Sequence, residues 1–101
     1  MATAEIAIIP MGTGSTSTSD FIAEADRVLL SHPEVKNKLT GMGTELECSD
    51  IDTLFEVLKE MHQKSFTKGA QRMYTVIKID DRRDKESTLE SKVTSLEKKL
   101  A

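Results

Sequence analysis

Cysteine is almost missing from this chain, because Cys48 is the only thiol among 101 residues. A lone cysteine excludes an intrachain disulfide and a multi-thiolate metal site. The sequence also has no apolar run approaching the ~20 residues of a membrane span. Residues 1–10 contain Glu5 and lack the basic and apolar segments of a signal peptide. These absences predict a cytoplasmic protein with no membrane partner.

An excess of charge of either sign is missing too. The chain has 14 Lys and Arg residues against 17 Asp and Glu residues, a net charge of -3, and a pI near 5.4. Nucleic-acid-binding domains normally show a basic patch and a pI above ~9, so we expect no nucleic-acid partner. The length fits one domain, residues 1–101, whose own core is modest, so self-association would add buried area.

Recognisable catalytic and cofactor patterns are absent. His32 and His62 are predicted to lie on different helices, and Cys48 has no histidine near it in sequence. Gly12 and Gly14 lack the third glycine of a dinucleotide-binding loop, and no zinc-ligand spacing occurs. We therefore predict no metal, no cofactor and no catalytic residues.

Local patterns predict the secondary structure. Strands are expected at residues 4–9, 35–40, 44–48 and 72–80, because these segments are rich in β-branched residues or flank turn signals. Helices are expected from Ser19 or Asp20 to residue 31, from a cap at residues 49–52 to Gly69, and after a capping box at residues 87–90. The apolar stripes are Phe21, Ala25, Val28 and Leu29 in the first helix and Leu54, Val57, Leu58 and Met61 in the second.

This order is βαββαβ plus a C-terminal helix. Right-handed crossovers then give an α+β, ferredoxin-like sandwich with a four-stranded antiparallel sheet and two helices on one face. Alternation along the strands places Ile6, Ile8, Ile77 and Ile79 under the helices. The other face would carry Ala7, Ile9, Tyr74 and Val76 beside Glu5, Lys78 and either Glu45 or Glu47.

That second face is too apolar for a monomer and predicts a homo-oligomer, although an ordinary half-apolar open sheet is the alternative. The C-terminal helix has a stripe of Leu89, Val93, Leu96 and Leu100. This stripe is too short for a free-standing coiled coil. It is equally compatible with packing on its own sheet and with packing on a neighbouring subunit.

Two polar clusters remain. One is the loop that contains Thr13 and Ser15, and the other is the charged run of Lys78, Asp80, Asp81, Arg82 and Arg83. The loop leaves the end of the first strand, and the charged run follows the antiparallel last strand. We therefore expect the clusters at opposite ends of one subunit, so that a shared site would need a second subunit.

Three segments resemble a family of roughly 100-residue proteins long catalogued as uncharacterised and later grouped as thiamine-binding domains. They are AEIAIIPMGTGSTS (residues 4–17), LTGMGT (39–44) and IKIDDRRDK (77–85). The resemblance covers essentially the whole chain. It implies a ferredoxin-like fold, assembly as a homotetrameric dimer of dimers through sheets and C-terminal segments, and binding of thiamine or its hydroxymethylpyrimidine portion in transport, salvage or storage. The chain departs from the family at Gly41, where proline is frequent.

The implied ligand makes chemical demands. Its aminopyrimidine needs hydrogen-bond partners, and its thiazolium cation favours carboxylates or an aromatic face. Glu5 or Glu47 is the hypothesised carboxylate, Tyr74 the aromatic, and Thr13, Ser15, Thr40 and Thr44 the neutral partners. The charged run would bind an anion or a second subunit. A structural or regulatory oligomer without a ligand stays open as an alternative, as does an enzyme acting on a phosphorylated precursor.

Overall fold

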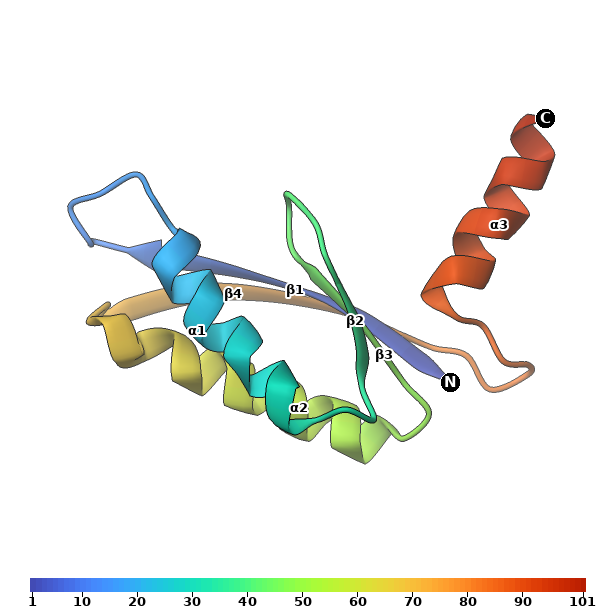
Figure 1. The fold of residues 1–101 in the computed structure, drawn as a ribbon, viewed down its shortest axis with the longest axis horizontal. Helices are drawn as coiled ribbons and strands as arrows, with labels where there is room; N and C mark the ends of the chain where they lie inside the picture. Colours follow the sequence, from blue (N-terminus) through green and yellow to red (C-terminus); the bar gives the residue numbers. More distant parts are fainter.

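The computed structural model describes residues 1–101 as a sheet covered on one face by two helices, with a third helix standing apart (Figure 1). The strands are β1 (Ala2–Met11), β2 (Lys36–Leu39), β3 (Thr44–Cys48) and β4 (Arg72–Asp81). The helices are α1 (Ser19–Arg27), α2 (Ile51–Lys64) and α3 (Leu89–Leu100), and short 3-10 helices extend α1 (Val28–Ser31) and α2 (Ser65–Lys68). The predicted α+β, ferredoxin-like order is confirmed.

The sheet is antiparallel throughout, with strand order β2-β3-β1-β4. Strand β1 is longer than predicted and continues through Pro10, which we expected to end it. Proline has no backbone N–H to donate to a neighbouring strand, so within sheets it is tolerated mainly where a strand has a free side. Beyond Ile6, β1 pairs only with β4, so Pro10 lies where one side of β1 has no neighbouring strand.

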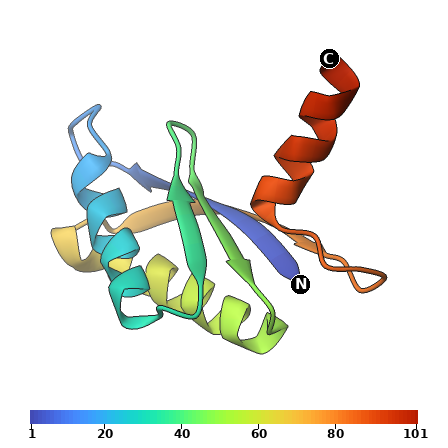
Figure 2. The same cartoon turned by 45° about the vertical axis from the view of Figure 1, so that its right-hand side comes forward.

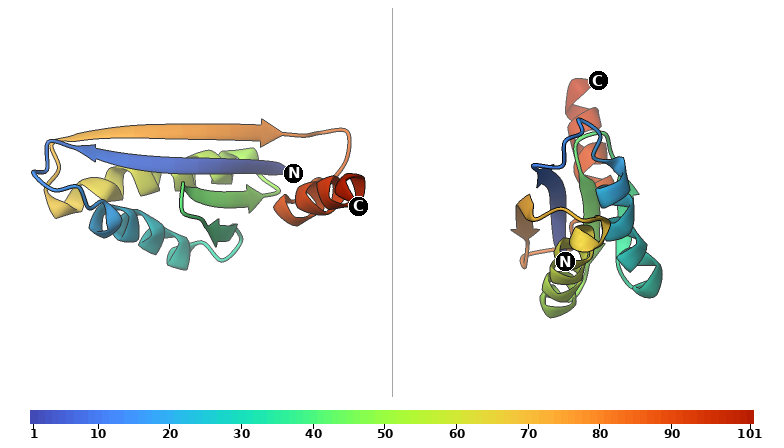
Figure 3. Two further views of the ribbon diagram at one scale, coloured as in Figure 1. Left: turned by 90° about the horizontal axis from the view of Figure 1, so that it is seen from above. Right: turned by 90° about the vertical axis from the view of Figure 1, so that its left-hand side faces the viewer.

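The core lies between the sheet and the two helices (Figure 3). The second predicted stripe is confirmed, since Leu54, Val57, Leu58 and Met61 are all buried. In α1, Ala25 is buried and Ile22 packs against the core in the place we expected for Phe21, and Leu29 is buried in the 3-10 helix that follows. The Asp50 side chain caps α2 by accepting from the Asp52 N–H at 3.1 Å.

Strand β4 is less covered than predicted. Ile77 pairs with Ile6 and Ile79 with Ala4, so both face the helices as expected, yet 41% and 36% of their surface is exposed. The helix layer reaches only the first half of this outer strand. There Met73 packs on the core, and the His62 ring nitrogen lies 2.8 Å from the Thr75 hydroxyl. Apolar side chains are therefore exposed on both faces of β4.

Helix α3 projects from the end of the sheet where β1 begins (Figure 2). Its capping box differs from the predicted one: Ser91 N–H donates to Thr88 Oγ1, and Thr88 N–H donates to Ser91 Oγ, both at 2.9 Å. None of its residues is buried, and Val93, Leu96 and Leu100 are exposed. The molecule accordingly measures 44 × 31 × 19 Å.

Candidate functional site

The sheet face opposite α1 and α2, which we call the open face, carries most of the predicted charged residues. Glu5 is flanked across the strands by Glu45 and Lys78, and its carboxylate lies 3.2 Å from the Lys78 ammonium. Tyr74 lies on the same face and is exposed. The open face thus holds an ion pair beside an exposed apolar area, as predicted.

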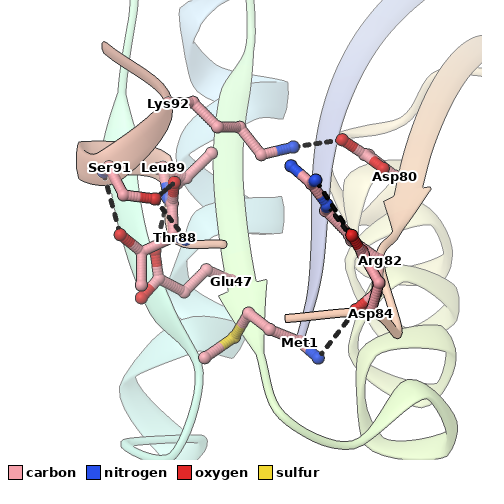
Figure 4. Close-up of polar contacts among 9 residues, drawn as sticks. All are labelled: Met1, Glu47, Asp80, Arg82, Asp84, Thr88, Leu89, Ser91 and Lys92. Carbon is pink, nitrogen blue, oxygen red and sulfur yellow. Dashed lines mark hydrogen bonds and ion pairs between the residues drawn. The ribbon is translucent and has the colours of Figure 1, made fainter. Parts of the chain in front are cut away.

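Glu47 has a structural role in this chain. Its carboxylate is buried beneath the start of α3 and accepts the backbone N–H of Leu89 at 2.9 Å (Figure 4). Amides of the first helical turn lack partners within the helix, and a carboxylate satisfies them well. Asp80 adds a second link, because Lys92 of α3 forms an ion pair with it. These contacts attach the base of α3 to its own sheet.

The charged run after β4 is internally paired. Arg82 donates to both carboxylate oxygens of Asp84, at 2.7 and 3.0 Å, and Arg83 donates to Asp81 at 2.8 Å. These hydrogen bonds hold the pKa values of Asp81 and Asp84 below their ordinary range. The arginines are therefore already neutralised by neighbours.

The loop between β1 and α1 lies at the other end of the molecule. Thr13 and Ser15 are hydrogen-bonded to each other, through Ser15 N–H to Thr13 Oγ1 at 3.3 Å. Met11 pairs with Arg72, whereas Ala2 pairs with Asp81, so the loop and the charged run are separated by the length of β1 and β4. The expected separation of the two polar clusters is confirmed.

A pocket absent from the sequence predictions lies where β3 stops pairing. The β1–β3 ladder ends at Ile6 and Thr44, but β1 continues to Met11 beside β4 alone. The space left beside β1, which we call the β1-edge pocket, has a volume of about 460 Å³. It is lined by 13 residues, seven of them hydrophobic: Ile6, Ala7, Ile8, Ile9, Thr18, Ile22, Asp26, Leu39, Thr40, Gly41, Met42, Gly43 and Thr44.

Asp26 is the only ionisable residue that lines this pocket. It lies on α1, four residues after Ile22, and its Oδ1 accepts a hydrogen bond from the Thr44 hydroxyl at 3.0 Å. Burial raises the pKa of the Asp26 carboxyl above its ordinary value, and the Thr44 hydrogen bond opposes this rise. The pocket therefore offers a partly desolvated carboxylate with no cation beside it.

The turn between β2 and β3 forms the opposite wall. Thr40 Oγ1 donates to the Gly43 carbonyl at 2.7 Å and accepts from the Gly43 N–H at 3.1 Å, which keeps the turn closed. Gly43 touches β1 so closely that a Cβ there would lie 3.0 Å from Glu5 Cγ and 3.1 Å from the Ile6 carbonyl oxygen. Met42, at the tip, is exposed at the pocket rim.

The pocket can supply three kinds of contact. Its walls are mostly apolar, Asp26 and the threonines provide hydrogen bonds, and the free edge of β1 presents alternate backbone N–H and C=O groups. This combination is typical of small-molecule sites. Two larger hollows, between α1 and α2 and beneath α3, have mainly charged and polar linings.

The predicted ligand residues therefore fall into separate groups. Thr40 and Thr44 line the β1-edge pocket, while Glu5, Glu47 and Tyr74 lie on the open face and Thr13 and Ser15 in the loop. Asp26 was missed, although its i+4 spacing from the apolar Ile22 places a carboxylate on the inner side of α1.

His32 and Cys48, the remaining side chains with reactive groups, make structural contacts. His32 lies 2.8 Å from Glu60 and 3.2 Å from Glu34, and these contacts raise its pKa. Cys48 is buried in the core. No three metal-ligating side chains come together. No helix combines the length and apolar character needed to cross a bilayer.

Known proteins match this chain over nearly its whole length. A family model described as thiamine-binding protein matches residues 4–97. A UPF0045 protein of Methanothermobacter thermautotrophicus is 44% identical over 99% of this chain and 100% of its own length. A UPF0045 protein of Bacillus subtilis is 42% identical over 99% of this chain and 98% of its own.

Solved structures agree with the fold. A hypothetical protein of Methanocaldococcus jannaschii superposes with a TM-score of 0.83 at 34% identity, covering 95% of both chains. A Thermotoga maritima protein, provisionally described as one of thiamine biosynthesis or salvage, gives a TM-score of 0.76 at 20% identity. It covers 94% of this chain and 97% of its own.

Proposed function

The chain belongs to the thiamine-binding protein family, and from that premise we propose that it binds thiamine or its hydroxymethylpyrimidine portion without catalysing a reaction. The observation that carries the proposal is the β1-edge pocket, with apolar walls around one partly buried carboxylate. An aminopyrimidine is a flat ring whose amino group needs an acceptor. Asp26 provides that acceptor, and the free edge of β1 provides further backbone partners.

The family and its thiamine-related neighbour support transport, salvage or storage of the vitamin as the biological setting. An enzymatic role on a phosphorylated precursor has less support. The two arginines that would bind a phosphate are engaged with Asp81 and Asp84. Placing the ligand at Asp26 also replaces the hypothesised contact with Glu47, whose carboxylate accepts the Leu89 amide.

Thermal denaturation tests ligand binding directly. At a thiamine concentration 100-fold above Kd, a ligand specific for the native state adds about 2.7 kcal/mol, which raises Tm by about 10 °C or more in a domain of this size. We expect this rise with thiamine and with hydroxymethylpyrimidine, and none with tetramethylammonium at equal concentration. The Asp26→Ala variant should lose about half of the rise or more. An equal response to all three compounds would reject specific binding.

We also propose that the chain self-associates as a homotetramer through the open face and α3. The open face exposes Ile9, Met11, Tyr74 and Val76, and α3 exposes Val93, Leu96 and Leu100 of its apolar stripe. Contiguous apolar area of this kind is unusual on a monomer. Because α3 is attached only at its base and none of its residues is buried, the stripe is available to a neighbouring subunit.

Light scattering at micromolar concentration tests the assembly. The wild-type chain should scatter as a multiple of 11.2 kDa, and Val76→Lys should shift it toward the monomer because a charge would be buried unpaired. Leu30→Lys is the matched control, since Leu30 is 83% exposed on the helix side. A wild-type chain that scatters as a monomer would reject the proposed self-association through the open face.

A further inference from the structure

The charge around the β1-edge pocket restricts what Asp26 can bind. Glu24 and Arg27, on the same helix, pair with each other, and Lys68 lies 3.8 Å from Glu24. None of these three residues lines the pocket. From β3, only the neutral Thr44 hydroxyl reaches the Asp26 carboxylate.

The remaining nearby charges face away from Asp26. Glu5 lies on the open face and is paired with Lys78, and Glu45 is its neighbour on that same face. The turn that forms the opposite wall contains no ionisable side chain. A ligand that contacts Asp26 must therefore itself supply whatever hydrogen atoms or positive charge the carboxylate needs.

A neutral aminopyrimidine has one hydrogen-bond donor too few to satisfy both oxygens of the Asp26 carboxylate. Its amino group donates to one carboxylate oxygen, but the adjacent ring nitrogen is an acceptor and would face the second oxygen. Two acceptor lone pairs would then oppose each other between apolar walls, and leaving buried polar groups unmatched is costly. One added proton, on the ring nitrogen or on the carboxyl, converts the contact into two parallel hydrogen bonds.

We propose that Asp26 and the aminopyrimidine bind as a pair sharing one proton taken from the solvent, so that ligand binding is coupled to proton uptake. This inference rests on the proposed function and specifies the protonation state in which the same pocket takes its ligand. Burial favours the protonated carboxyl at this position. The proton comes from buffer and no covalent bond to the ligand forms.

Calorimetric titration at pH 7 in buffers of different ionisation enthalpy measures the coupling. With either thiamine or hydroxymethylpyrimidine, the wild-type chain should take up about one proton per ligand, and its affinity should fall about tenfold per pH unit as the pH rises further. Asp20→Asn, on the exposed side of α1, is the matched control and should retain the uptake. Binding by the wild-type chain without proton uptake would overturn the inference while leaving the proposed function intact.

Two Asp26 variants distinguish proton uptake from the hydrogen bonds that Asp26 makes with the ligand. Asp26→Asn carries an amide that donates to the ring nitrogen and accepts from the amino group, so it should bind with no proton uptake and with an affinity nearly independent of pH. Asp26→Ala should weaken binding at least about tenfold, because a charge-assisted hydrogen bond is lost. Proton uptake that persists in Asp26→Asn would also overturn the inference. Absence of any binding to the wild-type chain would instead reject the proposed function.

Discussion

Replacing Leu54 by alanine should lower the free energy of unfolding by about 2–5 kcal/mol. Leu54 is fully buried on the inner face of α2, in the cluster that joins both helices to the sheet. The truncation removes apolar contacts and leaves a cavity that close-packed neighbours fill only in part. Since domains of this kind have only about 5–15 kcal/mol of stability, the variant should lose a large fraction of its total.

Denaturant titration at a fixed protein concentration measures this change, because self-association would otherwise alter the apparent stability. Phe55→Ala is the matched control. Phe55 is the next residue of α2 but is 56% exposed, so its truncation should cost less than about 1 kcal/mol. Similar losses in the two variants would contradict the inner and outer faces assigned to α2.

Replacing Gly43 by alanine should both destabilise the chain by about 1–3 kcal/mol and weaken ligand binding. The added Cβ would press on the Glu5 side chain and on the Ile6 carbonyl oxygen. The side chain can move, but the carbonyl belongs to the central strand. The turn must therefore shift outward, which opens the wall of the β1-edge pocket.

Gly41→Ala is the control for this effect, because a Cβ at Gly41 meets no atom within 4 Å. It should be neutral or stabilising by up to about 1 kcal/mol, since alanine restricts the unfolded chain. Denaturant titration gives the stability of both variants, and calorimetry with thiamine gives their affinity. Equal behaviour of the two alanine variants would show that the turn does not depend on close approach to β1.

The fold could be predicted because local signals and topology agree. The apolar stripe of α2, its cap at Asp50 and the turn at residues 40–43 each depend on neighbours in sequence, and all appear in the structure. The errors occur where tertiary context decides. Pro10 looked like the end of a strand, but a strand with one free side accepts it. Ile77 faces the helices as expected, yet how far the helix layer extends over β4 has no local signal.

The candidate site was harder to predict because it arises from a difference in strand length. Strand β1 extends five residues, from Ala7 to Met11, beyond the end of its pairing with β3, and the pocket is the space left beside this extension. A register of this kind depends on pairing between distant segments. Thr40 and Thr44 were selected for their hydroxyls, but the partner of Thr44, Asp26, comes from a helix 18 positions earlier in the chain. The spacing from Ile22 to Asp26 was the only local indication.

The position of β1 in the sheet also has a consequence for synthesis of the chain. Of the four strands of this sheet, the first to be synthesised, β1, is a central one, and its longest partner, β4, begins at Arg72. At roughly 5–20 residues per second, translation leaves β1 without that partner for several seconds. During this interval Ile6 and Ile8, buried in the finished protein, have no completed core to enter. These apolar side chains therefore stay open to misassociation until β4 has been made, because the sheet cannot close before then.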